Sequence, residues 1–267
     1  MSDDDQWRLG AREERAPFQS EPQNVRVWTE SWVQRWMYCP RCGGQGLSKY
    51  SNNNPAADFW CGSCREDFEL KSQKGRFGAR VVDGAYTTMS QRIREKLNAS
   101  LLLLQYDRES LQVRNLVAVP KHFFTLDVLE QRKPLAPTAR RAGWIGCNIL
   151  LSQVPAIGRI AMVEERRARA KEQVLEQWRR LSFLHDEGMA GRGWLIEVMH
   201  CVEMIGRAEF TLAEVYAFEE RLARKYPGNA HVRQKIRQQL QVLRDGGYLE
   251  FRGRGVYRLR PFDGGAS

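Results

Sequence analysis

The sequence predicts an α/β domain with an inserted metal-binding hairpin, followed by a small domain of three helices and a β-hairpin. Two Cys-x-x-Cys pairs lie 18 residues apart near the N-terminus. Helix and strand patterns alternate over residues 26–187, and three helical patterns followed by a glycine-rich turn occupy 188–267. We therefore expect domains at 26–187 and 188–267, preceded by an N-terminal extension at 1–25.

The composition favours a polyanionic partner. The 267 residues include 42 Lys and Arg against 32 Asp and Glu, a formal net charge of +10, and nucleic acid is the commonest partner of so basic a surface. A membrane partner is not expected, because no basic amphipathic anchor or lipidation motif accompanies the charge. We find no secretory signal and no long apolar segment, and so expect the protein in the reducing cytoplasm.

Four cysteines have the spacing of a zinc ribbon, in which two tight turns each direct two thiolates at one tetrahedral ion. The alternative is a pair of disulfides, which a reducing compartment disfavours. Cys147 and Cys201 stand alone and are expected to be buried as small apolar side chains. The expected structural zinc ligands, within a hairpin over 39–64, are Cys39, Cys42, Cys61 and Cys64.

The segments around this hairpin alternate between helix and strand patterns. Trp28, Trp32 and Trp36 recur at helical spacing, which predicts a helix packed on a core, with a base-stacking surface as the alternative. Residues 1–25 lack apolar periodicity and are expected to form a mobile extension or a weak surface helix. Further elements are expected as a helix at 83–97 and strands at 67–71, 100–106, 111–119 and 160–163.

Two features suggest how the domains are joined. Residues 164–185 are densely charged and predict an exposed connecting helix. The three glycines between Gly188 and Gly193 then indicate the domain boundary.

The last 75 or so residues have the order of a winged helix. A helix at 194–205 is followed by Thr211 and Glu214, which form a capping box for a second helix, and a third helix runs from about 229 to 245. A hairpin with a basic, glycine-rich turn completes the domain at 248–259.

The third helix of this domain has a polar face suited to the major groove of DNA. Gln and Arg side chains read adenine and guanine edges bidentately, and the basic hairpin favours contact with phosphates. The alternative is a solvated polar face on a protein-interaction winged helix. The expected DNA-contacting residues are Gln234, Arg237 and Gln238 on the helix, beside Gln241, with Arg252 and Arg254 on the hairpin.

Acidic residues and a lysine flank the second cysteine pair. Strand alternation places Glu69 and Lys71 on one face, and Asp58 can reach that face from the neighbouring strand. Asp58, Glu69 and the Leu70 carbonyl could ligate Mg²⁺ while Lys71 orients or deprotonates the attacking water. This is the arrangement that phosphodiester hydrolysis requires, with a 5′-phosphate product. Taken alone, the pattern is also compatible with a surface salt bridge.

The arrangement Pro55-Ala-Ala-Asp58 to Glu69-Leu-Lys71 resembles the PD-(D/E)xK nuclease superfamily. Within it, the chain is similar over roughly residues 26–260 to the DpnI-type restriction endonucleases. The resemblance rests on the stretches 38–43, 83–86, 131–149 and 235–245.

The resemblance implies a PD-(D/E)xK core and a type II site-specific deoxyribonuclease. Such an enzyme would cut double-stranded DNA at GATC sites whose adenines are methylated, using Mg²⁺ and a structural zinc, with both domains reading the modified sequence. It also implies that the catalytic residues are Asp58, Glu69 and Lys71, and that the zinc ligands are the four paired cysteines.

Residues 132–149 suit a position beside nucleic acid. Arg140 and Arg141 can bind phosphate or guanine, and Trp144, close to glycines, can present an apolar face to methyl groups. The resemblance assigns methyl contact to Trp144. The alternative is a Trp144 buried in the core.

Two other functions remain open. The chain could be a zinc-ribbon winged-helix regulator that binds DNA without cutting it, or a nuclease of the same fold with a different site specificity. No obligate protein partner is expected.

Overall fold

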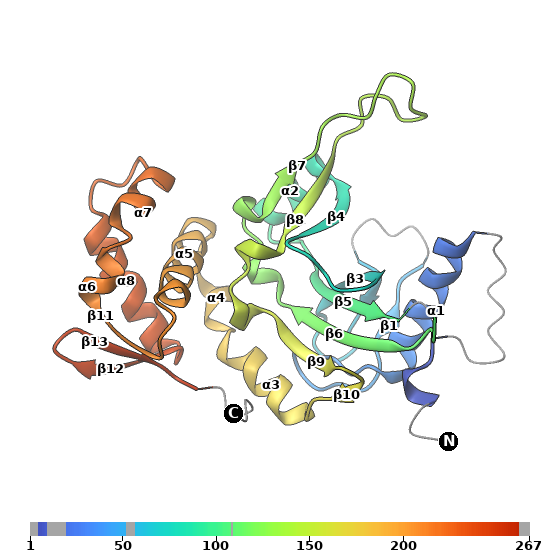
Figure 1. Ribbon diagram of the computed structural model, residues 1–267, viewed down its shortest axis with the longest axis horizontal. Helices are drawn as coiled ribbons and strands as arrows, with labels where there is room; N and C mark the ends of the chain where they lie inside the picture. Colours follow the sequence, from blue (N-terminus) through green and yellow to red (C-terminus); the bar gives the residue numbers. More distant parts are fainter. Residues whose placement is uncertain (1–4, 10–19, 52–56, 108, 262–267) are drawn as a thin grey trace. The chain divides into compact units, whose positions relative to one another are not determined.

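The computed structural model describes residues 5–9, 20–51, 57–107 and 109–261. The chain divides into two compact units, Met1–Trp178 and Arg179–Ser267, and the division falls inside the charged segment 164–185. The predicted fold class is confirmed: a mixed α/β unit with a four-cysteine cluster and a C-terminal unit of helix-turn-helix type (Figure 1).

A seven-stranded sheet forms the centre of the first unit, in the order β1-β2-β3-β5-β6-β9-β10. Strands β3 and β5 are parallel, with Glu69 opposite Leu101 and Lys71 opposite Leu103, and the other neighbours are antiparallel. Every residue of β5 is buried, as its leucine run requires. The strands are β1 Ser48–Lys49, β2 Phe59–Trp60, β3 Asp67–Lys74, β5 Ser100–Tyr106, β6 Val113–Val119, β9 Ile160–Glu164 and β10 Arg167–Ala168.

The expected tryptophan helix is α1, Glu21–Trp36, and part of the segment before it is packed rather than free. Residues Asp5–Trp7 form a short 3₁₀ helix, η1, and the rings of Trp7 and Trp32 lie 6.5 Å apart. The Trp32 indole N–H donates to the carbonyl of Gln6 at 2.6 Å, and Leu9 is buried. The expectation of a mobile or weakly helical extension at 1–25 is wrong for residues 5–9, because two large apolar side chains anchor them, and for residues 21–25, which belong to α1. Residues 1–4 and 10–19 lie outside the described residues.

The charged segment 164–185 is not simply an exposed helix. It contains β10 and the helices α3, Lys171–Arg180, and α4, Phe183–Asp186. Val174 and Trp178 are buried, and Trp178 meets Phe68 of β3 edge to face at 6.3 Å. The sequence analysis weighed the many charged residues and overlooked the apolar pair Val174 and Trp178 at i, i+4 spacing, which packs α3 on the central sheet.

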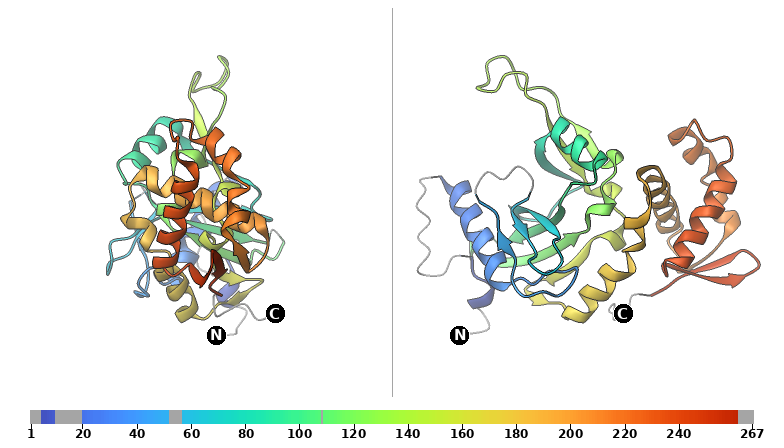
Figure 2. Two further views of the ribbon diagram at one scale, coloured as in Figure 1. Left: turned by 90° about the vertical axis from the view of Figure 1, so that its left-hand side faces the viewer. Right: turned by 180° about the vertical axis from the view of Figure 1, so that it is seen from behind.

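A second, three-stranded sheet was not predicted. Its order is β4-β8-β7, with β4 at Arg80–Ala85, β7 at Leu129–Gln131 and β8 at Gly146–Leu150. The helix expected at 83–97 is shorter than predicted, because β4 continues to Ala85 and α2 spans Tyr86–Arg94. The segment 132–145, which joins β7 to β8, projects away from both sheets (Figures 1 and 2). Short 3₁₀ helices link the two sheets: η2 Lys121–Phe123 and η3 Leu126–Val128 lie between β6 and β7, and η4 Leu151–Gln153 and η5 Ala156–Gly158 lie between β8 and β9.

The second unit has the predicted winged-helix order. Its sheet runs β11-β13-β12, and the long helix α8 buries Val232, Ile236, Leu240 and Leu243. The glycines at 191 and 193 lie in the first turns of α5. The elements are α5 Met189–Ile205, β11 Glu209–Thr211, α6 Leu212–Tyr216, α7 Glu219–Lys225, α8 Val232–Asp245, β12 Leu249–Gly253 and β13 Val256–Leu259. Across the described part of both units, none of the helices has both the length and the apolar character that a bilayer crossing demands.

The predicted capping box is present at the start of α6. The Thr211 hydroxyl accepts from the Glu214 N–H at 3.3 Å, and the Glu214 carboxylate accepts from the Thr211 N–H at 2.8 Å. We expect Thr211→Ala to destabilise the second unit by about 1 kcal/mol, because the Glu214 N–H at the helix start loses its acceptor. Calorimetric melting would measure this, with Thr211→Ser as the control that keeps the hydroxyl and should melt like the wild type.

Candidate active site and metal centre

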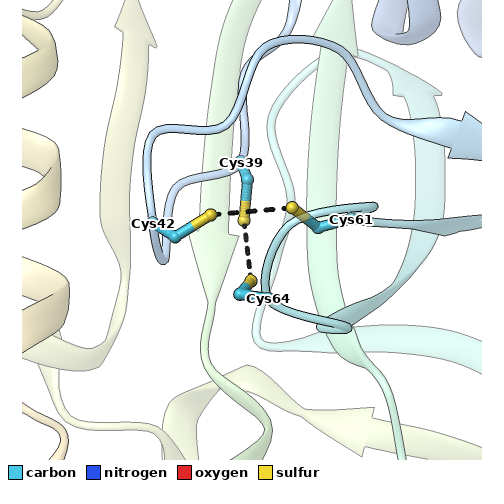
Figure 3. A group of neighbouring side chains, drawn as sticks. All are labelled: Cys39, Cys42, Cys61 and Cys64. Carbon is cyan, nitrogen blue, oxygen red and sulfur yellow. Dashed lines mark hydrogen bonds between the residues drawn. The ribbon is translucent and has the colours of Figure 1, made fainter.

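Four cysteines of the chain segment that joins α1 to β3 point their sulfurs toward one another (Figure 3). All four lie within 4.8 Å of one another, and the Cys39–Cys64 and Cys42–Cys61 sulfurs are 3.6 Å apart. The four cysteines are free in this structure, which does not support the disulfide alternative. Zinc–sulfur bonds of about 2.3 Å place the sulfurs of a tetrahedral site roughly 3.8 Å apart. The cluster is therefore compatible with a structural zinc.

Two backbone turns hold the cysteine pairs in place. The Gly43 N–H donates to the Cys39 carbonyl at 2.8 Å, and the Arg65 N–H donates to the Cys61 carbonyl at 2.9 Å. Gly43 has a φ of +77°, and a side chain there would meet Lys171. Burial raises the pKa of the Cys39 thiol, whereas at Cys61 the N–H groups of neighbouring residues outweigh burial and lower the pKa to about 7. Burial also raises the pKa of Cys64, to about 11, so Cys61 is the thiol of these three that ionises most readily.

A buried carboxylate fastens this hairpin to the central sheet. Glu66, two residues after Cys64, accepts from the Ser100 hydroxyl at 2.7 Å and from Arg41 at 2.8 Å, and lies 3.4 Å from the Lys121 ammonium. Ser100 begins β5 and Glu66 directly precedes β3. The same contacts therefore fix the hairpin and the start of the strand that carries Glu69 and Lys71.

The three residues predicted to be catalytic lie at one cavity of about 540 Å³. Asp58, just before β2, accepts from the Leu70 N–H at 2.8 Å. On β3 the Lys71 ammonium lies 2.6 Å from the Glu69 carboxylate, so strand alternation places both on one face as expected. Asp58, Glu69, Leu70 and Lys71 all line the cavity. Pro55 and Ala56 of the same motif lie outside the described residues.

The electrostatics of this cavity favour a divalent cation. Burial raises the pKa of Glu69 to about 7, an effect that the ion pair with Lys71 offsets only in part. Burial also raises the pKa of Asp58. For Lys71, burial lowers the pKa, but the attraction of Glu69 and Asp83 outweighs it and leaves the pKa raised. Two carboxylates held close together in a partly dry site suit an oxygen-seeking dication, with a lysine kept positively charged beside them.

Four further residues at or beside the cavity were missed by the sequence analysis. Arg26 and Glu30 line the cavity, whereas Asp83 and Lys49 contact residues that line it. Asp83 of β4 lies 2.6 Å from the Lys71 ammonium. On α1, Arg26 donates to Glu30 at 2.6 Å and lies 3.8 Å from the Asp58 carboxylate. Lys49 holds the other Glu30 oxygen at 2.7 Å. The i, i+4 spacing of Arg26 and Glu30 is visible in the sequence, but only the fold reveals that the pair faces Asp58.

The projecting segment 132–145 carries Arg140, Arg141 and Trp144, which the cavity does not include. Its base is closed by hydrogen bonds from Leu135 to the Trp144 carbonyl at 2.9 Å and from Gly143 to the Leu135 carbonyl at 3.0 Å. Both arginines are exposed, and the Arg141 guanidinium lies 4.7 Å from the centre of the half-buried Trp144 ring. Trp144 therefore belongs to the projecting segment and is only partly covered.

A side chain at Gly146, where this segment enters β8, would force the Trp144 ring to shift. A Cβ atom there would lie 2.8 Å from the Trp144 ring. The glycine thus permits the close approach of the indole to the backbone.

In the second unit, Gln234, Arg237 and Gln238 share an exposed face of α8, as predicted. Arg237 hydrogen-bonds the Tyr216 hydroxyl, and Gln238 accepts from Lys235 at 2.8 Å. Arg252 and Arg254 are exposed on the hairpin of β12 and β13. Gly253, Arg254 and Gly255 all have positive φ, so the two glycines relieve backbone strain in a turn that presents an arginine.

Comparison with known families agrees with this architecture. Residues 12–187 match the family described as DpnI: Dam-replacing family. Residues 190–259 match DpnI_C, the Dam-replacing HTH domain. Since the two matches together span most of the chain, the protein belongs to the DpnI family of restriction endonucleases and carries that family's C-terminal helix-turn-helix domain.

Proposed function

We propose that the protein is a methyl-directed type II endonuclease, which hydrolyses double-stranded DNA at GATC sites carrying methylated adenine and requires Mg²⁺. The observation that carries this proposal is the convergence of Asp58, Glu69 and Lys71 on one cavity of a DpnI-family chain. A zinc-ribbon regulator without cleavage activity would have no need for two carboxylates and a lysine at a common cavity.

The donor set fits Mg²⁺. The Asp58 and Glu69 carboxylates and the Leu70 carbonyl are hard oxygen ligands, and the cavity leaves room for water and phosphate oxygens. A bound Mg²⁺ would neutralise charge on the scissile phosphate and activate water. The chain supplies the Lys71 ammonium, whose raised pKa favours orientation of the attacking water and stabilisation of negative charge over proton removal. The product would carry a 5′-phosphate.

For the cysteine cluster we propose a structural zinc. Four thiolates complete a tetrahedral coordination shell and leave no position for substrate or water. The ion would therefore stabilise the hairpin before β3, on which Glu69 and Lys71 lie, without taking part in hydrolysis.

We assign sequence reading to both units. On the projecting segment, Arg140 and Arg141 would contact phosphate or guanine, and Trp144 would contact the adenine methyl groups. In the second unit, the exposed face of α8 would enter the major groove, and Arg252 and Arg254 would contact the DNA backbone.

A plasmid digest tests the function. Plasmid with methylated GATC sites should be cut with Mg²⁺ and left intact with EDTA, and unmethylated plasmid should survive both. Sequencing the ends identifies the site. Two intact plasmids would indicate a regulator, and cutting elsewhere would indicate a nuclease of different specificity.

Trp144→Ala is expected to lower the preference for methylated over unmethylated GATC sites about tenfold, because burial of two methyl groups contributes roughly 0.8 kcal/mol each. The ratio of kcat/KM on the two DNAs measures this. Trp144→Phe keeps an apolar ring and should retain most of the preference. A Trp144→Ala enzyme with the wild-type ratio would assign methyl reading to other residues.

A further inference from the structure

Asp83 belongs to the small sheet, yet its carboxylate contacts Lys71, which lines the cavity at the central sheet. One oxygen accepts from both the Lys71 ammonium at 2.6 Å and the Gly84 N–H at 2.7 Å. The Asp83 side chain is 5% exposed, against 19% for Lys71 and 26% for Glu69. Asp83 is thus the more deeply buried of the two acceptors that Lys71 contacts.

Pairing with β8 orders the backbone on both flanks of Asp83 and Gly84. Asp83 lies opposite Cys147 and Ala85 lies opposite Gly146, with a bulge between the two pairs. The buried Cys147 thiol donates to the Gly84 carbonyl at 3.5 Å. Strand β8 therefore holds the backbone on both flanks of the bulge, and the Gly84 N–H fixes the orientation of the Asp83 carboxylate.

The two carboxylates that contact Lys71 differ in their proposed roles. Glu69 is a proposed ligand of the divalent cation, and its Oε1 atom lies 2.6 Å from the Lys71 ammonium. An ammonium and a dication compete for the same carboxylate lone pairs. If Glu69 were the sole partner of Lys71, binding the cation would strand a partly buried ammonium, which costs free energy. Asp83 offers Lys71 a second, fixed partner.

We propose that Asp83 is a positioning residue that retains Lys71 and so leaves Glu69 available to the divalent cation. The inference rests on the proposed function, because it takes Glu69 as a cation ligand. Asp83→Asn then weakens cation binding, because the Lys71 ammonium is left with Glu69 as its acidic partner and competes with the cation for the Glu69 carboxylate.

Calorimetric titration of the full-length protein with Mn²⁺ or Mg²⁺ tests this without relying on cleavage. We expect Asp83→Asn to weaken cation binding about tenfold, comparable to one partly buried ion pair. In a Lys71→Met background, the same Asp83→Asn change should alter binding less than about threefold, because no ammonium competes for Glu69. Asp83→Glu keeps the charge and should recover part of the affinity.

Equal weakening in both backgrounds would overturn the inference, because Asp83 would then act only through its own negative charge. Unchanged binding in Asp83→Asn would overturn it as well. Melting curves show which variants fold, and Asp83→Ser replaces Asp83→Asn if the latter does not. If the wild-type protein neither binds the cation nor cuts methylated DNA, the proposed function is refuted. If the wild type cuts methylated DNA but Asp83→Asn leaves cation binding unchanged, only the inference about Asp83 is refuted.

Discussion

Asp58→Asn is expected to reduce cleavage of methylated DNA by about 10³-fold or more, while binding to that DNA persists. The amide keeps the shape of the side chain and can still accept from the Leu70 N–H, so the local fold is preserved. It removes one of the two negative charges proposed to hold the cation. Single-turnover cleavage measures the rate, and binding in Ca²⁺ measures affinity.

Lys71→Met should cause a loss of similar size, because no other residue of β3 can place an ammonium at this point of the cavity. Asp67→Asn is a matched control, since Asp67 lies on the same strand but accepts from the Tyr50 hydroxyl and does not line the cavity. The control should cut at nearly the wild-type rate. Near-normal turnover in Asp58→Asn or Lys71→Met would refute the catalytic assignment.

Local sequence patterns predicted the parts of the site whose residues are close together along the chain. The pairs Cys39–Cys42 and Cys61–Cys64 each occupy one tight turn, so spacing alone indicates their geometry. Glu69 and Lys71 are two residues apart on one strand, and strand alternation places them on one face. The polar face of α8 follows from helical periodicity in the same way.

Contacts between segments that are distant along the chain could not be predicted from local sequence patterns. Asp83 reaches Lys71 because the small sheet folds against the site, and strands β7 and β8 are too short and irregular to predict from alternation. Arg26 depends on the direction in which α1 faces. Trp7 was missed for a related reason, because its packing partner Trp32 belongs to a different segment. Burial of this kind depends on the whole fold rather than on a local period.

The cysteine hairpin and strand β3 are linked by direct contacts. Asp58 lies three residues before Cys61, and Glu66 lies between Cys64 and the start of β3. Because Glu66 binds Arg41 of the first cysteine turn and Ser100 of β5, displacement of that turn is transmitted to the strand that carries Glu69. The cluster is therefore expected to govern the order of the cavity as well as the stability of the hairpin.

Cys39→Ser should abolish zinc binding and unfold or strongly destabilise the first unit. Structural zinc contributes about 10–16 kcal/mol of binding free energy in small zinc domains, as much as the whole stability of a typical domain. Cys39 is fully buried, so the variant also leaves an unmatched hydroxyl among three thiolates. Metal analysis of the purified protein gives the zinc content, and calorimetric melting gives the stability of each unit.

Cys201→Ala is the matched control, because Cys201 is equally buried but stands alone in α5 of the second unit. It should retain one zinc per chain and lose only about 1 kcal/mol, the cost of a small core cavity. Chelation of the wild type should reproduce the Cys39→Ser phenotype, since both remove the same ion. A Cys39→Ser protein that contains no zinc and yet melts like the wild type would contradict this prediction. Packing contacts such as that of Trp178 with Phe68 would then be sufficient to stabilise the first unit.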